Sequence, residues 1–265
     1  MINNISKSLT KTYRKPIWKK FLKAITDYHL ISENDTIGVC ISGGKDSFLL
    51  ALLLKELQKH SKYNFNLKFI VMNPGYKKDH LNQIIDNAKL LELDVSIFKT
   101  NIFLDIENSK SPCYLCARKR RGHLYNEAQK LGCNKIALGH HFNDVIETIM
   151  LNVLYNGSYG SMLPKLKSDH YDNMELIRPL YLVKEVDIIK WVNYNELQFL
   201  NCACEVTNKK TDSKRFEIKV LIKQLKANFN DIDTNIFKSS ENVNLKTILG
   251  YKNNNKKVNI IDENE

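Results

Sequence analysis

Short apolar runs alternate with longer amphipathic stretches along most of the chain. A short, mostly apolar run is typical of a buried parallel strand, whereas apolar positions spaced three and four residues apart indicate a helix. The pattern predicts strands at residues 36–41, 67–72, 94–98, 135–138 and 175–179, and helices at residues 47–57, 79–91, 116–131, 143–155, 184–195 and 212–229. We therefore expect an α/β fold, a Rossmann-like parallel sheet of about five strands with helices on both faces.

The same pattern divides the chain into four segments. Residues 1–34 predict a basic, helical N-terminal segment, and residues 35–205 hold the alternation of strands and helices. Residues 206–250 predict a basic helical extension, and residues 251–265, rich in Asn and Lys, predict a disordered tail. No apolar stretch approaches the ~20 residues that span a bilayer, and the N-terminus lacks the pattern of a signal peptide. These features predict a cytoplasmic protein with no membrane partner.

Positive charge is concentrated in three places. The chain carries 40 Lys and Arg against 29 Asp and Glu, a net charge of +11. Most of the excess lies in residues 7–23, 118–121 and 209–226, which together contain only two acids, Asp212 and Glu217. Concentrated positive charge favours a polyanionic partner such as nucleic acid. The alternative is a solvated surface that is rich in Lys and Asn.

The first predicted strand runs directly into the sequence SGGKDS at residues 42–47, where a helix begins at once. Glycines let the backbone turn sharply and approach a ligand closely, and the N–H groups at a helix N-terminus face an anion. Lys45 adds a positive charge, while Asp46 makes sense if it holds Mg²⁺ that bridges phosphates. The spacing of a Walker loop is absent. The loop therefore predicts a phosphate site of another class.

Four of the six cysteines form two close pairs, Cys113 with Cys116 and Cys202 with Cys204. Cytoplasmic thiols stay reduced, so two such pairs favour a soft-metal site, either zinc or iron–sulfur. The spacing fits neither a zinc ribbon nor a ferredoxin. Chance pairing and redox chemistry at the first pair are the alternatives.

These motifs resemble a known family. SGGKDS is similar to the pyrophosphate loop of the PP-loop N-type ATP pyrophosphatases, which adenylate a carbonyl oxygen and release pyrophosphate. The succession PCYLCARKRRG at 112–122, LGHHFND at 138–144, MLPKL at 162–166 and IRPL at 177–180 resembles the tRNA 2-thiocytidine synthetase family. The resemblance implies an ATP-dependent tRNA thiolase that adenylates the C2 carbonyl of an anticodon-loop cytidine and replaces its oxygen with sulfur.

The resemblance also implies cofactors and partners. It calls for ATP, Mg²⁺ and a [4Fe–4S] cluster held by three cysteines. By position these are Cys113, Cys116 and Cys202, with Cys204 as the substitute, since the family's second Cys-x-x-Cys pair is here Cys-Ala-Cys. The expected partners are tRNA and a sulfur donor, either a cysteine desulfurase or free sulfide, and the resemblance suggests a homodimer.

The resemblance also implies a role for each residue that matches the family motifs. Lys45, Asp46 and Asp144 are the expected catalytic residues, with Asp46 as the Mg²⁺ ligand. The expected ATP-binding residues are Ser42, Gly43, Gly44, Lys45, Asp46, Ser47, Gly139 and His140, and His141 follows the same strand. Arg118, Lys119, Arg120 and Arg121 are expected to grip tRNA phosphates. Where the family commonly has His-His-Arg-Asp-Asp, this chain has His-His-Phe-Asn-Asp, so only the second acid, Asp144, is kept.

Two other interpretations are open. One is an enzyme like tRNA lysidine synthetase, which shares the ATP loop but needs no cysteines. The other is a zinc-stabilised RNA-binding protein that keeps a non-catalytic nucleotide loop. Cysteine substitutions and product analysis separate the three.

Overall fold

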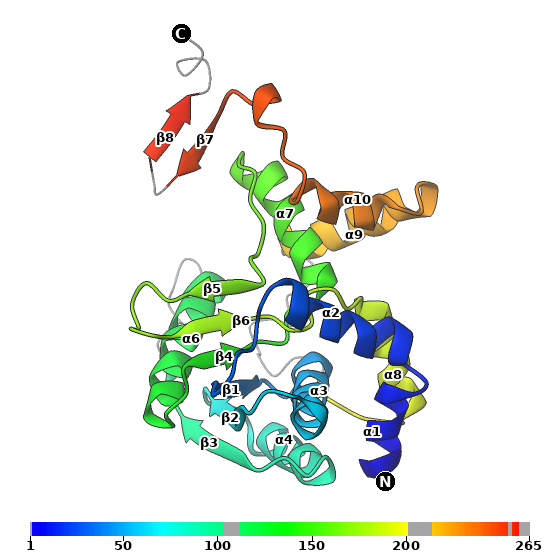
Figure 1. Cartoon of the computed structure of the whole chain (residues 1–265), viewed down its shortest axis with the longest axis vertical. Helices are drawn as coiled ribbons and strands as arrows, with labels where there is room; N and C mark the ends of the chain where they lie inside the picture. Colours follow the sequence, from blue (N-terminus) through cyan, green and yellow to red (C-terminus); the bar gives the residue numbers. More distant parts are fainter. Residues whose placement is uncertain (1, 103–111, 201–213, 254–255, 260–265) are drawn as a thin grey trace. The chain divides into compact units, whose positions relative to one another are not determined.

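A computed structural model of the chain describes residues 2–102, 112–200, 214–253 and 256–259 (Figure 1). The chain divides into two compact units. The first unit contains Met1–Val145 and Met162–Ser213, and the second contains Ile146–Ser161 and Lys214–Glu265. The basic N-terminal segment thus belongs to the first unit, and residues 146–161 leave the predicted strand–helix region to join the second.

The first unit is built on a six-stranded sheet in the order β3-β2-β1-β4-β6-β5. Its strands are β1 (Thr36–Ile41), β2 (Asn66–Asn73), β3 (Val95–Lys99), β4 (Lys135–Ala137), β5 (Lys165–Lys167) and β6 (Glu175–Ile177). The predicted parallel α/β sheet is confirmed, because all neighbours pair in parallel except β5, which runs antiparallel to β6 at the edge. The sequence pattern misses β5, since Lys165–Lys167 holds a single apolar residue between two lysines.

Helices connect the strands of the first unit. They are α3 (Lys45–His60), α4 (Lys78–Leu90), α6 (Pro112–Lys130), α7 (Phe142–Asn156) and α8 (Glu185–Tyr194), preceded by α1 (Ile2–Thr10), the π-helix η1 (Arg14–Trp18) and α2 (Lys19–Asp27). Figure 1 shows α3 and α4 on one side of the sheet and α6 on the other, as predicted. No helix in the described ranges has the length and apolar character needed to cross a membrane.

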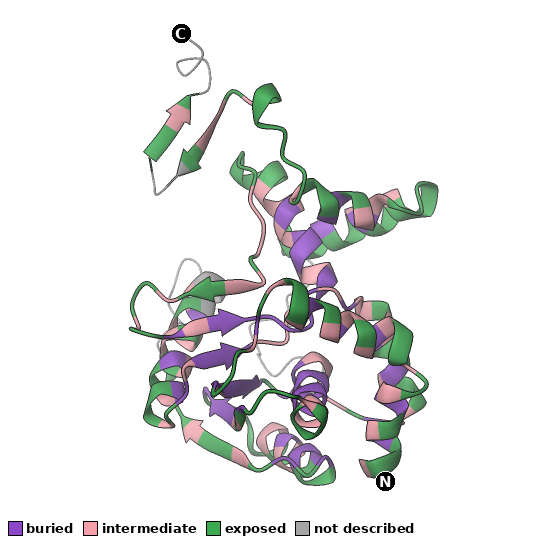
Figure 2. Cartoon of the chain, viewed as in Figure 1, coloured by how far each residue is buried: buried purple, intermediate pink, exposed green. Residues whose placement is uncertain are grey.

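Helix α3 lies at the centre of the core. The SGGKDS loop of residues 42–47, the nucleotide loop, leads into its first turn. Every residue from 48 to 54 is buried, so the helix is enclosed on all sides. Figure 2 shows buried residues gathered on α3 and on the central strands that pack against it. A helix fixed in this way holds its N-terminus rigidly at the carboxyl end of β1, where ligands bind in open α/β sheets.

The second unit is mostly helical and ends in a hairpin. It contains most of α7, from Ile146 onward, together with α9 (Lys214–Asn228), α10 (Ile232–Ser239), the 3₁₀ helix η3 (Leu245–Thr247), and strands β7 (Gly250–Asn253) and β8 (Lys256–Asn259). The hairpin lies where the composition predicts a disordered tail. Tyr251 pairs with Val258 in it, and both residue types have a high propensity for strands. The Asn- and Lys-rich composition of this segment does not indicate a pairing between two strands, so the hairpin was not predicted.

Candidate active site

The nucleotide loop turns sharply between β1 and α3. Gly43 has a φ of 91°, a conformation that side chains rarely adopt, and a Cβ there would lie within 2.9 Å of the Ile84 and Leu200 side chains. Gly44 is the N-cap residue of α3, so no side chain caps the first turn of the helix. The loop therefore presents backbone N–H groups and the positive end of the helix dipole, as an anion site requires.

Two serines of the loop have different roles. The hydroxyl of Ser47 is buried, donates to the Gly44 carbonyl at 2.8 Å and accepts from the Ser42 N–H at 3.2 Å. Ser47 thus braces the turn from inside. Ser42 is exposed, and its hydroxyl lies 3.3 Å from that of Ser47. Of the two, Ser42 is the better placed to reach a ligand.

Lys45 is held between two carboxylates. Its Nζ lies 3.1 Å from Asp46 Oδ2 and 3.2 Å from Glu185 Oε1, at the start of α8. Burial disfavours the charged lysine, but the two carboxylates outweigh burial, and the pKa of Lys45 is raised. Glu185 could not be identified from the sequence, because an acid in the first turn of a helix is commonplace.

Asp46 has a buried oxygen that lacks a hydrogen-bond partner within the described residues. This atom, Oδ1, lies 3.9 Å from His141 Nε2, which is beyond hydrogen-bond distance. Burial raises the pKa of Asp46, and His141 and Lys45 only partly offset that effect. A buried, unsatisfied carboxylate oxygen is costly, and a divalent cation would satisfy it. The carboxylate therefore fits the Mg²⁺ that accompanies ATP.

Asp144 acts on His141. Its Oδ2 accepts from the His141 backbone N–H at 2.9 Å and lies 3.3 Å from His141 Nδ1. The imidazole is buried, and its other nitrogen faces Asp46. The sequence pointed to Asp144 and His140 as site residues, but in the structure Asp144 contacts His141, whose Nε2 lies 3.9 Å from Asp46 Oδ1. The pair of histidines after β4 indicates a functional histidine in this loop, but the sequence does not show which of the two faces Asp46.

Gly139 packs directly against the nucleotide loop. A Cβ at this position would lie 3.0 Å from the Asp46 carbonyl carbon and 3.1 Å from the Ser47 nitrogen. A side chain at this position would push against the backbone of the first turn of α3, so glycine favours the close approach of the loop after β4. This geometry explains Gly139 by backbone packing, and the neighbouring His140 is half-buried in the same loop.

The two residues that depart from the family pattern both contact the start of α8. Lys184 Nζ lies 5.3 Å from the centre of the Phe142 ring, a cation–π distance. Asn143 Oδ1 accepts the Glu185 N–H at 2.9 Å, which satisfies a donor in the first turn of α8. These two contacts thus hold the start of α8 in place, and with it Glu185, which pairs with Lys45.

The first cysteine pair lies on α6, which begins at Pro112, four residues before the predicted start. Cys113 and Cys116 are three positions apart in the first turns of the helix, where the helix dipole favours thiolates. Cys116 is buried with Met72 and Ile102. Cys202, Cys204 and the side chain of Cys113 lie outside the described residues. Among the side chains that are described, no group of three His, Cys, Asp or Glu is arranged to hold a metal ion.

The four consecutive basic residues follow the cysteines on α6. Arg118 and Arg121 are exposed, whereas Lys119 and Arg120 are half-buried. Sequence reasoning missed a fifth basic residue, Arg178 of the IRPL motif, which is buried and donates to the Leu163 carbonyl. Burial lowers the pKa of Arg178 to about 10.

Comparisons with known proteins agree with this geometry. A family model described as a PP-loop domain matches residues 13–225. A tRNA-cytidine(32) 2-sulfurtransferase from Pelobacter propionicus is 35% identical over 86% of this chain and 85% of its own length. One from Coxiella burnetii is 36% identical over 87% of this chain and 90% of its own length.

A solved structure shares the fold. It is the U34-tRNA thiolase NcsA from Methanococcus maripaludis with its [4Fe-4S] cluster, which superposes with a TM-score of 0.67. The match covers 84% of this chain and 76% of that one at 22% sequence identity. At this identity the likeness shows the fold alone.

Proposed function

The chain belongs to the family of tRNA-cytidine(32) 2-sulfurtransferases, which is built on a PP-loop domain, and we propose that it thiolates cytidine 32 of tRNA at the expense of ATP. One observation carries the proposal. At the carboxyl end of β1, a lysine and an uncapped helix N-terminus lie beside a buried carboxylate oxygen with no hydrogen-bond partner in the described chain. Polyphosphate with Mg²⁺ is the ligand that satisfies both charges at once.

The C2 carbonyl of cytidine needs activation because its oxygen is a poor leaving group. Attack of that oxygen on the α-phosphate of ATP forms a carbon–oxygen–phosphorus link and breaks the bond to pyrophosphate. Sulfur then adds at C2, and the original oxygen leaves within AMP. The protein must stabilise the negative charge on the α-phosphate and on the departing pyrophosphate.

Each residue of the loop has a part in that task. The N–H groups at the start of α3 and the ammonium of Lys45 would face the phosphate oxygens, and Ser42 would add a hydroxyl. Mg²⁺ bound at Asp46 would supply the remaining positive charge. Asp144 would act through His141, whose imidazole it orients toward Asp46. Asp144 is thus proposed as a positioning residue.

Sulfur delivery is assigned to a [4Fe–4S] cluster on Cys113, Cys116 and Cys202, with Cys204 as the alternative third ligand. The two cysteines of α6 fit this donor set, since they are one turn apart near a helix N-terminus and Cys116 lies in an apolar setting with Met72 and Ile102. The cluster would hold the sulfur for transfer to C2. Arg118 to Arg121 would grip tRNA phosphates beside it. A cysteine desulfurase or free sulfide as donor, a homodimer and a cytoplasmic location complete the proposal.

Product analysis tests the function. Protein purified without oxygen is incubated with tRNA that lacks thiolation, ATP, Mg²⁺ and sulfide, and the digested tRNA is examined by mass spectrometry. We expect 2-thiocytidine together with equal amounts of AMP and pyrophosphate, and no product with α,β-methylene ATP. ADP and phosphate as products, or lysidine in place of 2-thiocytidine when lysine is supplied together with sulfide, would contradict the proposal.

A further inference from the structure

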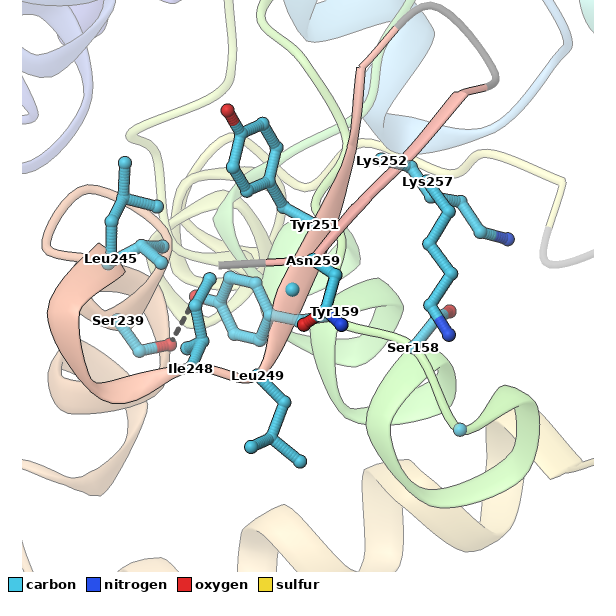
Figure 3. A pocket seen from close by; sticks show the side chains of 13 residues that line it. Ser158, Tyr159, Ser239, Leu245, Ile248, Leu249, Tyr251, Lys252, Lys257 and Asn259 are labelled. Atoms are coloured by element: carbon cyan, nitrogen blue, oxygen red, sulfur yellow. Dashed lines mark hydrogen bonds between the residues drawn. The ribbon is translucent and has the colours of Figure 1, made fainter. Parts of the chain in front are cut away.

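The second unit contains a cavity that the proposed chemistry does not use. Its volume is about 1180 Å³, and it lies against the hairpin β7–β8. Figure 3 shows Lys252 and Lys257 on one side of it, Leu245 and Ser239 on the other, and Tyr159 between them. Apart from residues 157–159, the lining residues lie beyond residue 225, where the match to the PP-loop model ends.

One wall of the cavity is apolar and open to solvent. Leu249 is 80% exposed and Leu245 is 53% exposed, and Val243 and Ile248 line the same cavity. The ring of Tyr159 is half exposed, and its hydroxyl donates to Ser239 Oγ at 2.8 Å, which fixes the orientation of the ring. Large apolar side chains left in water together with a fixed aromatic ring mark a binding surface.

The other wall is positively charged. Lys252 and Lys257 are directly opposite each other in the hairpin. Like charges in that position destabilise a strand pair, and an anion between them would remove the penalty. None of the described lining residues is acidic, and the sequence from 242 to 259 contains no Asp or Glu. The cavity therefore complements a ligand that joins a negative group to a flat apolar one.

Single-stranded RNA has that chemistry, since each nucleotide carries a phosphate and a base that stacks on aromatic rings. We propose that the cavity binds an unpaired nucleotide of tRNA, with its phosphate between Lys252 and Lys257 and its base against Tyr159 and the apolar wall. The inference rests on the proposed function, which makes tRNA the substrate. A second copy of the chain fits less well, because a symmetric interface centred here would bring two lysine pairs together.

Charge reversal in the full-length protein tests the inference. The variant K252E/K257E is compared with K238E/K246E, which makes the same change of charge on exposed lysines of the second unit that do not line the cavity. We expect the cavity variant to weaken tRNA binding on the order of tenfold relative to the control and to lower the slope of log Kd against log salt by about 0.7, as for one lost phosphate contact. Equal affinities for the two variants would overturn the proposal.

A second pair of variants tests the ring. Tyr159→Leu keeps apolar bulk but removes the aromatic face, whereas Tyr159→Phe loses only the hydrogen bond to Ser239. We expect about a fivefold or greater loss of tRNA affinity for Tyr159→Leu and a smaller loss for Tyr159→Phe. Equal affinity of Tyr159→Leu and wild type for tRNA would contradict the claim that a base stacks on the Tyr159 ring.

Two further measurements distinguish a failure of the RNA-binding inference from a failure of the proposed function. Light scattering of K252E/K257E reports oligomeric mass, and a lower mass with unchanged tRNA affinity would assign the cavity to an interface between copies and overturn the RNA inference. Binding of α,β-methylene ATP should be unchanged in every cavity variant. A wild-type protein that binds tRNA through the cavity but forms no 2-thiocytidine would contradict the proposed function and leave this inference standing.

Discussion

The nucleotide loop and the hairpin cavity both present lysines to a ligand, but the groups beside those lysines have opposite charges. Lys45 lies between two carboxylates, Asp46 and Glu185, whereas Lys252 faces another lysine, Lys257. The difference follows from the ligands proposed for the two sites. Nucleoside triphosphate arrives with Mg²⁺, so its site needs acidic as well as basic groups, but an RNA phosphate needs positive charge alone.

Removing the acid from the nucleotide loop should have the largest effect. Asp46→Asn deletes the charge proposed to hold Mg²⁺, so we expect AMP formation to fall on the order of a thousandfold. Binding of tRNA should stay within twofold of wild type. Near-normal turnover in Asp46→Asn, measured by AMP release, would show that the carboxylate has no part in catalysis.

The same substitution should stabilise the fold. Burial raises the pKa of Asp46, so the folded state prefers the protonated form. A raised carboxyl pKa contributes stability below the pKa of the unfolded state, and this contribution is lost as pH rises through the folded pKa. At neutral pH and without Mg²⁺, Asp46→Asn should therefore melt at a higher temperature than wild type, and the difference should vanish at acidic pH. A lower melting temperature at neutral pH would contradict the burial argument.

Cysteine substitutions test the other half of the chemistry. Cys116→Ser should remove the brown chromophore of protein purified without oxygen and reduce 2-thiocytidine formation at least a hundredfold. Cys133→Ser is the matched control, because Cys133 is also buried but its thiol, with a pKa raised by burial to about 11, is not a proposed ligand. An intact spectrum and unchanged 2-thiocytidine formation in Cys116→Ser would contradict the three-cysteine cluster, and stoichiometric zinc without iron would favour the zinc-stabilised RNA-binding interpretation.

The carboxylate that pairs with Lys45 should have a moderate effect. In Glu185→Gln the lysine loses one negative neighbour, so ATP should bind more tightly, while the less firmly held ammonium should lower kcat about tenfold. Asp187→Asn makes the same change of charge in the same turn of α8 and contacts neither residue of the loop through any ion pair described. Parallel changes in KM and kcat for both variants would mean that Glu185 acts only through the overall field.

The smallest effect concerns Asn143, one of the two residues that depart from the family pattern. Asn143→Ala removes the acceptor for the Glu185 N–H and should lower the melting temperature by a few degrees, as for a lost helix cap of about 1 kcal/mol. Asn143→Asp supplies a carboxylate acceptor in the same place and should melt at or above the wild-type temperature. A larger loss of kcat in Asn143→Asp than in Asn143→Ala would give Asn143 a chemical role.

The sequence was a good guide where the chemistry is local. A buried strand followed at once by SGGKDS fixes the loop, the helix and their place in a parallel sheet, and the family resemblance is confirmed by relatives about a third identical to this chain. The hairpin was not predicted, because its stabilising Tyr251–Val258 pair is a contact between strands in a polar segment.

Partners from distant parts of the chain could not be predicted. Glu185 reaches Lys45 across 140 positions, and its approach depends on Asn143 and on the packing of α8. Spacing also left the two histidines equivalent, although only His141 is fixed by Asp144 in a direction that faces Asp46. Such roles depend on which way a loop turns in three dimensions, and that is decided by packing.

Oxygen tracing tests the central claim most directly. A tRNA whose target cytidine carries ¹⁸O at C2 is incubated with the anaerobic protein, ATP, Mg²⁺ and sulfide, and the nucleotides are analysed by mass spectrometry. Attack of the C2 oxygen on the α-phosphate predicts one ¹⁸O atom in AMP for each 2-thiocytidine formed. AMP without the label, or ¹⁸O in inorganic phosphate, would contradict the account.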